Sequence, residues 1–101
     1  MRTITIQIGN SDDKLSQAEW AKFHAAVDMF VNARAEQVHF SGLSSGNAPW
    51  QNAAWVFTIH ENATKYLQGD LARACSEFRQ DSIAWLEGET EFITEAGWKF
   101  T

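Results

Sequence analysis

The chain has 101 residues, which is enough for one domain with a single buried core. Hydrophobic residues make up 45% of it, a level typical of globular proteins, so disorder is not expected. Its 13 acidic and 8 basic residues give a net charge of −5, and the basic residues are scattered, so the surface should repel phosphate backbones and nucleic acid is not an expected partner.

The amino-terminal segment alternates between polar and apolar residues and leads directly into a strand, without the apolar stretch of a secretion signal. No run of residues approaches the length of a membrane span. Cys75 is the only cysteine and lies in a helical pattern beside apolar residues, so we interpret it as a small buried side chain. These features predict a cytoplasmic protein without a disulfide or a membrane anchor.

The first two elements have clear signals. Residues 3–8 alternate strictly, which predicts a strand with Ile4, Ile6 and Ile8 on one face. After a polar loop, Ser16 and Glu19 have the spacing of a capping box, which predicts a helix running to about Ala33. Apolar residues at intervals of three and four form the face of this helix that should pack on the sheet: Trp20, Phe23, Val27, Phe30 and Val31.

The middle of the chain predicts an antiparallel hairpin, with β-rich runs at 36–42 and 53–60 joined by a turn-rich segment. The hydrophobic pattern favours a register with Val38 opposite Ile59, Phe40 opposite Phe57 and Gly42 opposite Trp55, all on the core face. The opposite face would then carry Gln37, His39, Ser41, Val56, Thr58 and His60.

A second helix should follow, with Asn62 as its N-cap. Its apolar face would consist of Leu67, Leu71, Ala74, Cys75 and Phe78. Residues 82–87 are predicted as the fourth strand, and Gly88 marks a turn or bulge, after which 90–93 either continues the strand or doubles back. The tail could add a short edge pairing through Trp98 and Phe100.

The order strand, helix, strand, strand, helix, strand is that of the split βαβ arrangement. It predicts one α+β domain over residues 1–101, a ferredoxin-like βαββαβ sandwich with a four-stranded antiparallel sheet and two helices on one face. Because the other face would be bare and carries Val56, we expect a second copy or a partner to cover it.

Few residues suggest chemistry. His39 and His60 would share the open face, where an acid–base role is conceivable, but no third ligand accompanies them. We therefore assign no catalytic residue, no metal site and no cofactor. Glu87, Glu89 and Glu91 would lie on one side of a continuous strand, where they could protect a sheet edge or meet a basic partner.

The 5 tryptophans are too many for so small a core. Trp20 and Trp55 belong to predicted core faces, whereas Trp50, Trp85 and Trp98 cannot all be buried. A partly exposed tryptophan is a common anchor at protein interfaces and can also stack on a ring-shaped ligand.

Three segments carry a resemblance: Ala18-Glu19-Trp20-x-x-Phe23, the hairpin with Trp50, and Phe78-Arg79-Gln80-Asp81-Ser82-Ile83. With these the chain resembles a family of small bacterial ferredoxin-like proteins of unassigned function, and it is similar to accessory proteins of bacteriophages of actinobacteria. The resemblance implies the fold and supplies no catalytic residues. The segment 87–91 departs from the family pattern.

Two functions follow as hypotheses. The first is a non-enzymatic protein-interaction module, a homodimer and a bacteriophage accessory protein that binds and modulates or inhibits a basic host protein; its predicted contact residues are Trp50, Trp85, His39, Glu87, Glu89 and Glu91. The alternative is a small-molecule or nucleotide-binding protein, or a small enzyme, that uses the open sheet face of a dimer through His39, Thr58, His60 and Trp85.

Overall fold

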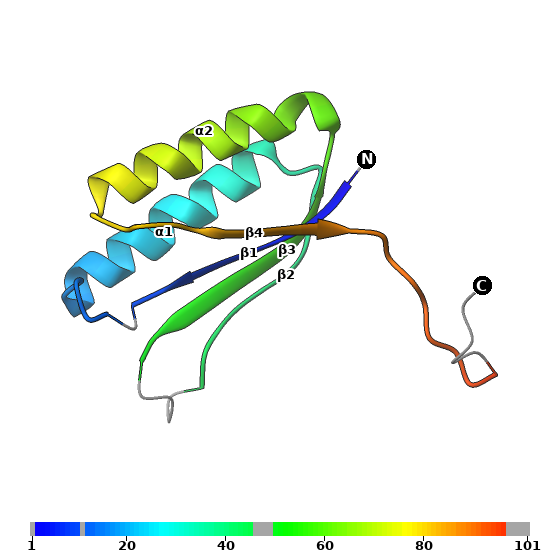
Figure 1. Ribbon diagram of the computed structural model, residues 1–101, viewed down its shortest axis with the longest axis horizontal. Helices are drawn as coiled ribbons and strands as arrows, with labels where there is room; N and C mark the ends of the chain where they lie inside the picture. The colour runs from blue at the N-terminus through cyan, green and yellow to red at the C-terminus, as the bar shows by residue number, and fades with distance from the viewer. Residues whose placement is uncertain (1, 11, 46–49, 97–101) are drawn as a thin grey trace.

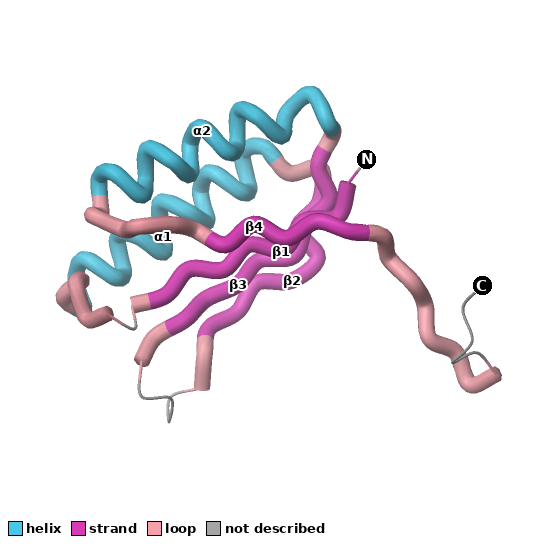
Figure 2. The backbone as a smooth tube through the Cα atoms, viewed as in Figure 1, coloured by secondary structure: helices cyan, strands magenta, loops and turns pink. Residues whose placement is uncertain are grey.

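The computed structural model describes residues 2–10, 12–45 and 50–96, and its elements follow the predicted order (Figure 1). They are β1 (Arg2–Gly9), α1 (Gln17–Arg34), β2 (Gln37–Leu43), β3 (Asn52–Ile59), α2 (Glu61–Glu77) and β4 (Ala84–Gly88). The strands form one antiparallel sheet in the order β2-β3-β1-β4, and both helices lie on the same side of it (Figure 2). The ferredoxin-like βαββαβ sandwich is confirmed.

The core lies between the sheet and the two helices. Ile4, Ile6 and Ile8 of β1 are buried as their alternation predicts, and Trp55 and Phe57 of β3 are completely buried beside them. Ile59 of β3 and Leu15 before α1 are also buried. The helices contribute further large core side chains, which include Trp20, Phe23, Val27, Val31, Leu67 and Leu71.

The capping box of α1 is confirmed. The Glu19 amide donates to the Ser16 hydroxyl at 3.2 Å, and the Ser16 amide donates to the Glu19 carboxylate at 3.1 Å. The hydrogen bond from the Ser16 amide, together with Arg79 at 2.7 Å, holds the pKa of Glu19 below its usual value. Because the folded-state pKa is lowered, this stabilisation is present above the ordinary pKa of glutamate and is lost as the pH falls through the lowered value.

Ser16→Ala is expected to lower the free energy of unfolding by about 1 kcal/mol, because it removes the side-chain acceptor from the first turn of α1. Urea unfolding followed by circular dichroism measures the loss. Ser76→Ala, at an exposed serine of α2, is the matched control and should change stability by less than ~0.5 kcal/mol. Equal losses in the two variants would contradict a specific role for the cap.

The second helix begins earlier than predicted. His60 is the N-cap residue and α2 starts at Glu61, so the expected cap Asn62 lies inside the first turn. The reason is tertiary: β3 runs to Ile59, the helix follows at once, and burial of Thr64 on the core side fixes its start. In the described part of the chain, neither helix combines the length and the apolar character needed to cross a membrane.

The fourth strand ends before the acidic residues Glu89 and Glu91. β4 covers Ala84–Gly88 instead of 82–87, and the described residues after it, 89–96, form neither a helix nor a strand. Neither alternative for 90–93, a continued strand or a strand that doubles back, is present, so Glu87, Glu89 and Glu91 do not line one side of a continuous strand. Trp98 and Phe100, the residues of the predicted edge pairing, lie outside the described residues.

The predicted hairpin register is wrong at all three predicted pairs, and the difference changes which residues lie on the open face. Val38 lies opposite Phe57, but the register then shifts, so that Phe40 lies opposite Val56 and Gly42 opposite Ala54. The extra residue is His39, which is a β-bulge. The bulge moves Phe40 from the expected core face to the open face. It also turns Ser41, predicted on the open face, to the helix side opposite Trp55.

Candidate functional site

The open face of the sheet is a grid of three rows that cross all four strands. Since residues opposite one another in a sheet project to the same side, the registers define each row. From β2 through β3 and β1 to β4, the rows are Gln37, Thr58, Thr3, Gly88; then Phe40, Val56, Thr5, Leu86; and then Gly42, Ala54, Gln7, Ala84.

The middle row is the most apolar, and we name Phe40, Val56, Thr5 and Leu86 the open-face stripe. Its two ends, Phe40 and Leu86, are 58% and 67% exposed, although both are large hydrophobic side chains. Val56 and Thr5 between them are half-buried. A mostly apolar band across a sheet face that no helix covers is typical of a contact surface.

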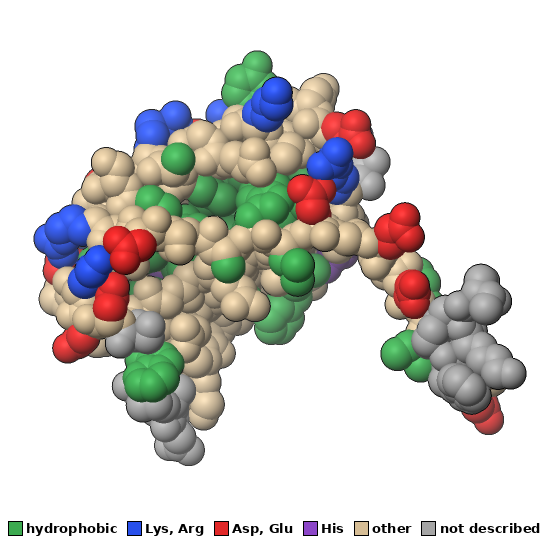
Figure 3. Space-filling view, in the orientation of Figure 1, with side chains coloured by type: hydrophobic (Ala, Val, Ile, Leu, Met, Phe, Trp, Pro, Cys, Tyr) green, Lys and Arg blue, Asp and Glu red, His purple; other side chains and the backbone are tan. Residues whose placement is uncertain are grey.

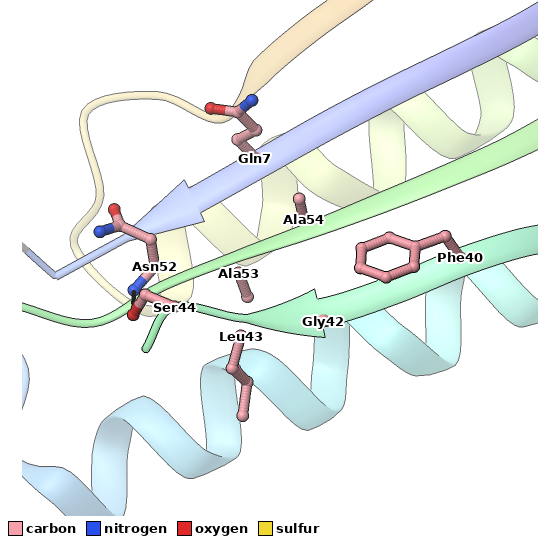
Figure 4. Close-up of a pocket in the computed structure, with 8 residues that line it drawn as sticks. All are labelled: Gln7, Phe40, Gly42, Leu43, Ser44, Asn52, Ala53 and Ala54. Carbon is pink, nitrogen blue, oxygen red and sulfur yellow. Dashed lines mark hydrogen bonds between the residues drawn. The ribbon is translucent and has the colours of Figure 1, made fainter. Parts of the chain in front are cut away.

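The third row contains a hollow next to the stripe (Figure 4). It exists because Gly42 and Ala54 are small, and the Phe40 ring forms one wall: a Cβ at Gly42 would lie 2.7 Å from the end of that ring. At the rim, the Ser44 amide donates to the Asn52 carbonyl at 2.8 Å. The hollow has a volume of about 310 Å³ and is lined by Gln7, Phe40, Gly42, Leu43, Ser44, Asn52, Ala53 and Ala54.

The four residues of the predicted ligand site are not brought together. Thr58 lies on the open face, and His39 is exposed at the bulge. His60 follows β3 and pairs with Glu36, with 3.2 Å between Nε2 and Oε2. Trp85 lies opposite Ile6 on the helix side of the sheet, so the prediction that it offers a stacking surface on the open face is wrong.

The predicted contact residues are also spread over the molecule. Trp50 is 51% exposed at the hairpin end. The Trp85 ring meets Phe57 edge-on, with centroids 6.3 Å apart, and its Nε1 donates to Glu87 at 3.3 Å. Glu89 and Glu91 lie beyond the end of β4. These six residues therefore form no single surface, and a contact role for each stays a prediction.

Glu87 belongs to a small surface ion-pair group. It accepts a hydrogen bond from Arg2 at 2.6 Å, and Glu61 lies 3.5 Å from the same guanidinium. The hydrogen bond and charge of Glu87 raise the pKa of Arg2 further above its already high value. This group ties β1, β4 and the start of α2 together at the surface, where such pairs contribute little to stability.

A second hollow lies between α2 and β4, where apolar side chains gather below the helix (Figure 3). Cys75 lines it, and burial raises the pKa of its thiol, which makes the thiolate less available. The volume is about 230 Å³, and the lining residues are Gln68, Leu71, Ala72, Cys75, Ile83 and Trp85. Within residues 2–10, 12–45 and 50–96, no group of three or more His, Cys, Asp or Glu side chains is placed to hold a metal ion.

Sequence reasoning missed Phe40 and Leu86 as residues of the open face. For Leu86 a signal was present: if Trp85 faces the helices, its neighbour in the strand must face the other way. For Phe40 no local signal exists, because the bulge at His39 reverses the alternation that the hydrophobic pattern suggests.

The fold and its apolar open face define a ferredoxin-like α+β protein. No protein-family model matches the chain, and no curated protein matches it. Among solved structures, the chain is similar to a crystal structure from Thermobifida fusca YX, described as a dimeric ferredoxin-like protein of unknown function. The TM-score is 0.62 at 13% sequence identity, over 89% of this chain and 92% of that one. At this identity the match supports the fold; a bacteriophage origin stays a prediction from the sequence.

Proposed function

We propose that this chain is a protein-interaction module that works as a homodimer, with two copies joined through their open sheet faces. The observation that carries the proposal is the open-face stripe, with Phe40 and Leu86 both more than half exposed. A twofold axis that lies between two such faces places the stripe of one copy against the stripe of the other. The same apolar patch is then buried on both copies. The Thermobifida fusca structure, which shares the fold, is described as dimeric.

The electrostatics of the face favour self-association. Every residue in its three rows is uncharged, although the chain as a whole has a net charge of −5. Two acidic molecules therefore repel one another least along this face. The acidic balance elsewhere favours a basic protein as a further partner, for which Trp50 at the hairpin end is the exposed aromatic anchor.

Leu86→Glu tests the proposal. Leu86 is 67% exposed in the single copy, so the variant should fold, but its carboxylate would be desolvated in the dimer. The dissociation constant should rise by at least about 30-fold, which corresponds to ~2 kcal/mol. Sedimentation velocity across a dilution series measures it.

Met29→Glu is the matched control, because Met29 is 59% exposed but lies on α1, away from the open face. It should dimerise like the unaltered chain. A monomeric unaltered chain at high micromolar concentration, or equal association of the two variants, would overturn the proposal.

A further inference from the structure

The described residues after β4, 89–96, are all exposed. Residues 89–96, which we name the C-terminal arm, leave the end of β4 and bend away from the two helices (Figures 1 and 2). Its Phe92 and Ile93 are 82% and 79% exposed, the highest values among the large hydrophobic side chains that the structure describes. Two adjacent apolar side chains on a projecting segment are typical of a contact that another molecule completes.

The arm and the hollow of one copy lie at opposite ends of the sheet. The arm starts after Gly88, which lies opposite Thr3, whereas the hollow lies at the row of Gln7 and Ala84. Suppose that the twofold axis lies between the two sheets and is perpendicular to the strands. The strands of the second copy then run in the direction opposite to those of the first. The end of β4 in that copy then lies over the hollow end of the first copy.

We propose that the C-terminal arms are exchanged in the dimer, and that Phe92 of one copy occupies the hollow beside Phe40, Gly42 and Ala54 of the other. This inference rests on the proposed function, because it requires open faces in contact. It adds the orientation of the two copies and a binding site with a defined occupant, a segment of the second copy.

The chemistry of the arm suits this hollow. In an extended segment successive side chains point to opposite sides, so Phe92 can enter the hollow while Glu91 stays in water. The hollow has an aromatic wall and a floor of small residues, and its polar lining residues, Gln7, Ser44 and Asn52, are all uncharged. An aromatic ring therefore fits it better than a carboxylate does.

The arm is also long enough. Phe92 is the fourth residue after Gly88, so in an extended arm its Cα can lie about 13 Å from Gly88, at about 3.3 Å per residue. Two packed sheets are separated by about 10 Å, and β3 lies two strand spacings, about 9.6 Å, to the side of β4, so the Ala54 end of the hollow is about 14 Å from Gly88 of the facing copy. The side chain of Phe92 covers what the backbone of the arm does not. An arm that leaves one sheet can therefore reach the third row of the facing sheet.

The area of the sheet face is a second reason for an exchanged arm. Four strands about 4.8 Å apart and about 20 Å long give a flat footprint of roughly 400 Å². Stable interfaces bury about 800 Å² per partner. Burial of Phe92 would add about 150–250 Å², and the rest of the arm would add more.

Phe92→Ser is the first test, with Glu91→Ser as the matched control in the same exposed arm. Phe92→Ser should raise the dissociation constant of the dimer at least about tenfold, as loss of an anchoring aromatic does. Glu91→Ser should leave it within about threefold, because a surface charge contributes little to affinity. Neither change touches the core, so the melting behaviour of the separate copies should not differ.

Disulfide trapping tests the location and the exchange together. In a Cys75→Ser background, which removes the only cysteine, a tagged chain carrying Phe92→Cys is mixed with an untagged chain carrying Ala54→Cys. Oxidation should give a disulfide-linked pair of tagged and untagged chains, because an arm seated in the hollow can bring the two Cα atoms to the separation of about 4.4–6.8 Å that a disulfide needs. The comparator is Ala72→Cys in the hollow between α2 and β4, which should not be linked.

The outcomes separate the inference from the proposed function. A monomeric unaltered chain would contradict the proposed function itself. A dimer that Leu86→Glu disrupts but Phe92→Ser leaves unchanged would overturn only the exchanged arm. Linkage to position 72 in preference to position 54, or no linked pair at all, would also overturn it.

Discussion

Trp55→Ala is expected to lower the free energy of unfolding by about 3–5 kcal/mol, a large share of the 5–15 kcal/mol typical of a small domain. Trp55 is completely buried in β3 and lies opposite Ile6 of the neighbouring strand. Its ring lies against the tilted His24 ring, with centroids 5.1 Å apart, and its Nε1 donates to Asp28 at 2.9 Å. Truncation leaves a cavity where sheet and α1 meet, and Asp28 loses this donor.

Chemical denaturation with a fluorescence-independent readout, such as far-ultraviolet circular dichroism, measures the loss. Trp50→Ala is the control, because it removes the same side chain from an exposed site and should cost less than ~1 kcal/mol. Trp55→Phe separates the two causes, since it keeps most of the ring volume but removes the hydrogen bond, at about 1–3 kcal/mol. Equal losses from Trp50→Ala and Trp55→Ala would contradict the position of Trp55 at the centre of the core.

Removing both arginines that neutralise Asp70 is expected to cost about 3 kcal/mol or more. The Asp70 side chain is 6% exposed and accepts hydrogen bonds from Arg34 at 3.1 Å and from Arg73. Arg34 is the last residue of α1 and also lies over the Tyr66 ring, 5.3 Å from its centroid. The combined variant Arg34→Met and Arg73→Met leaves a buried carboxylate between the helices without these two cations.

The control adds Asp70→Leu to that double variant. If the cost comes from the unpaired charge, a leucine of similar size should recover most of the lost stability, as measured by urea unfolding at neutral pH. Each arginine alone should cost less, since both are partly exposed and the other one still pairs with Asp70. A double variant as stable as the unaltered chain would contradict the role of this group in holding α2 to α1.

Folding and the proposed association can be tested separately, because the proposed dimer would use the side of the sheet that the core does not. Trp55 and Ile6 act on the helix side, and their substitution should change stability at every protein concentration. Phe40 and Leu86 lie on the open side, so under the proposed dimer changes there should appear in the dissociation constant. The two can be compared by measuring the apparent free energy of unfolding at several protein concentrations. It should rise with protein concentration in the unaltered chain but not in Leu86→Glu, because only a dimer that forms adds to the stability of the fold.

The sequence by itself determined the elements and their order. The alternation of Ile4, Ile6 and Ile8 and the capping box at Ser16 are local patterns. The first depends on which side of a short strand is buried, and the second on hydrogen bonds within one helical turn. The prediction of an uncovered sheet face carrying Val56 and Thr58 also followed from that order, and both residues lie there.

Only the tertiary structure decided what the open face contains. The bulge at His39 places Phe40 on it, although the local pattern assigns Phe40 to the core. The pairing of β1 with β4 turns Trp85 toward the helices and Leu86 outward, and Asp70 meets Arg34 from 36 positions away. Such outcomes depend on contacts between distant segments, where an extra residue in a strand costs little locally but reverses every side chain that follows.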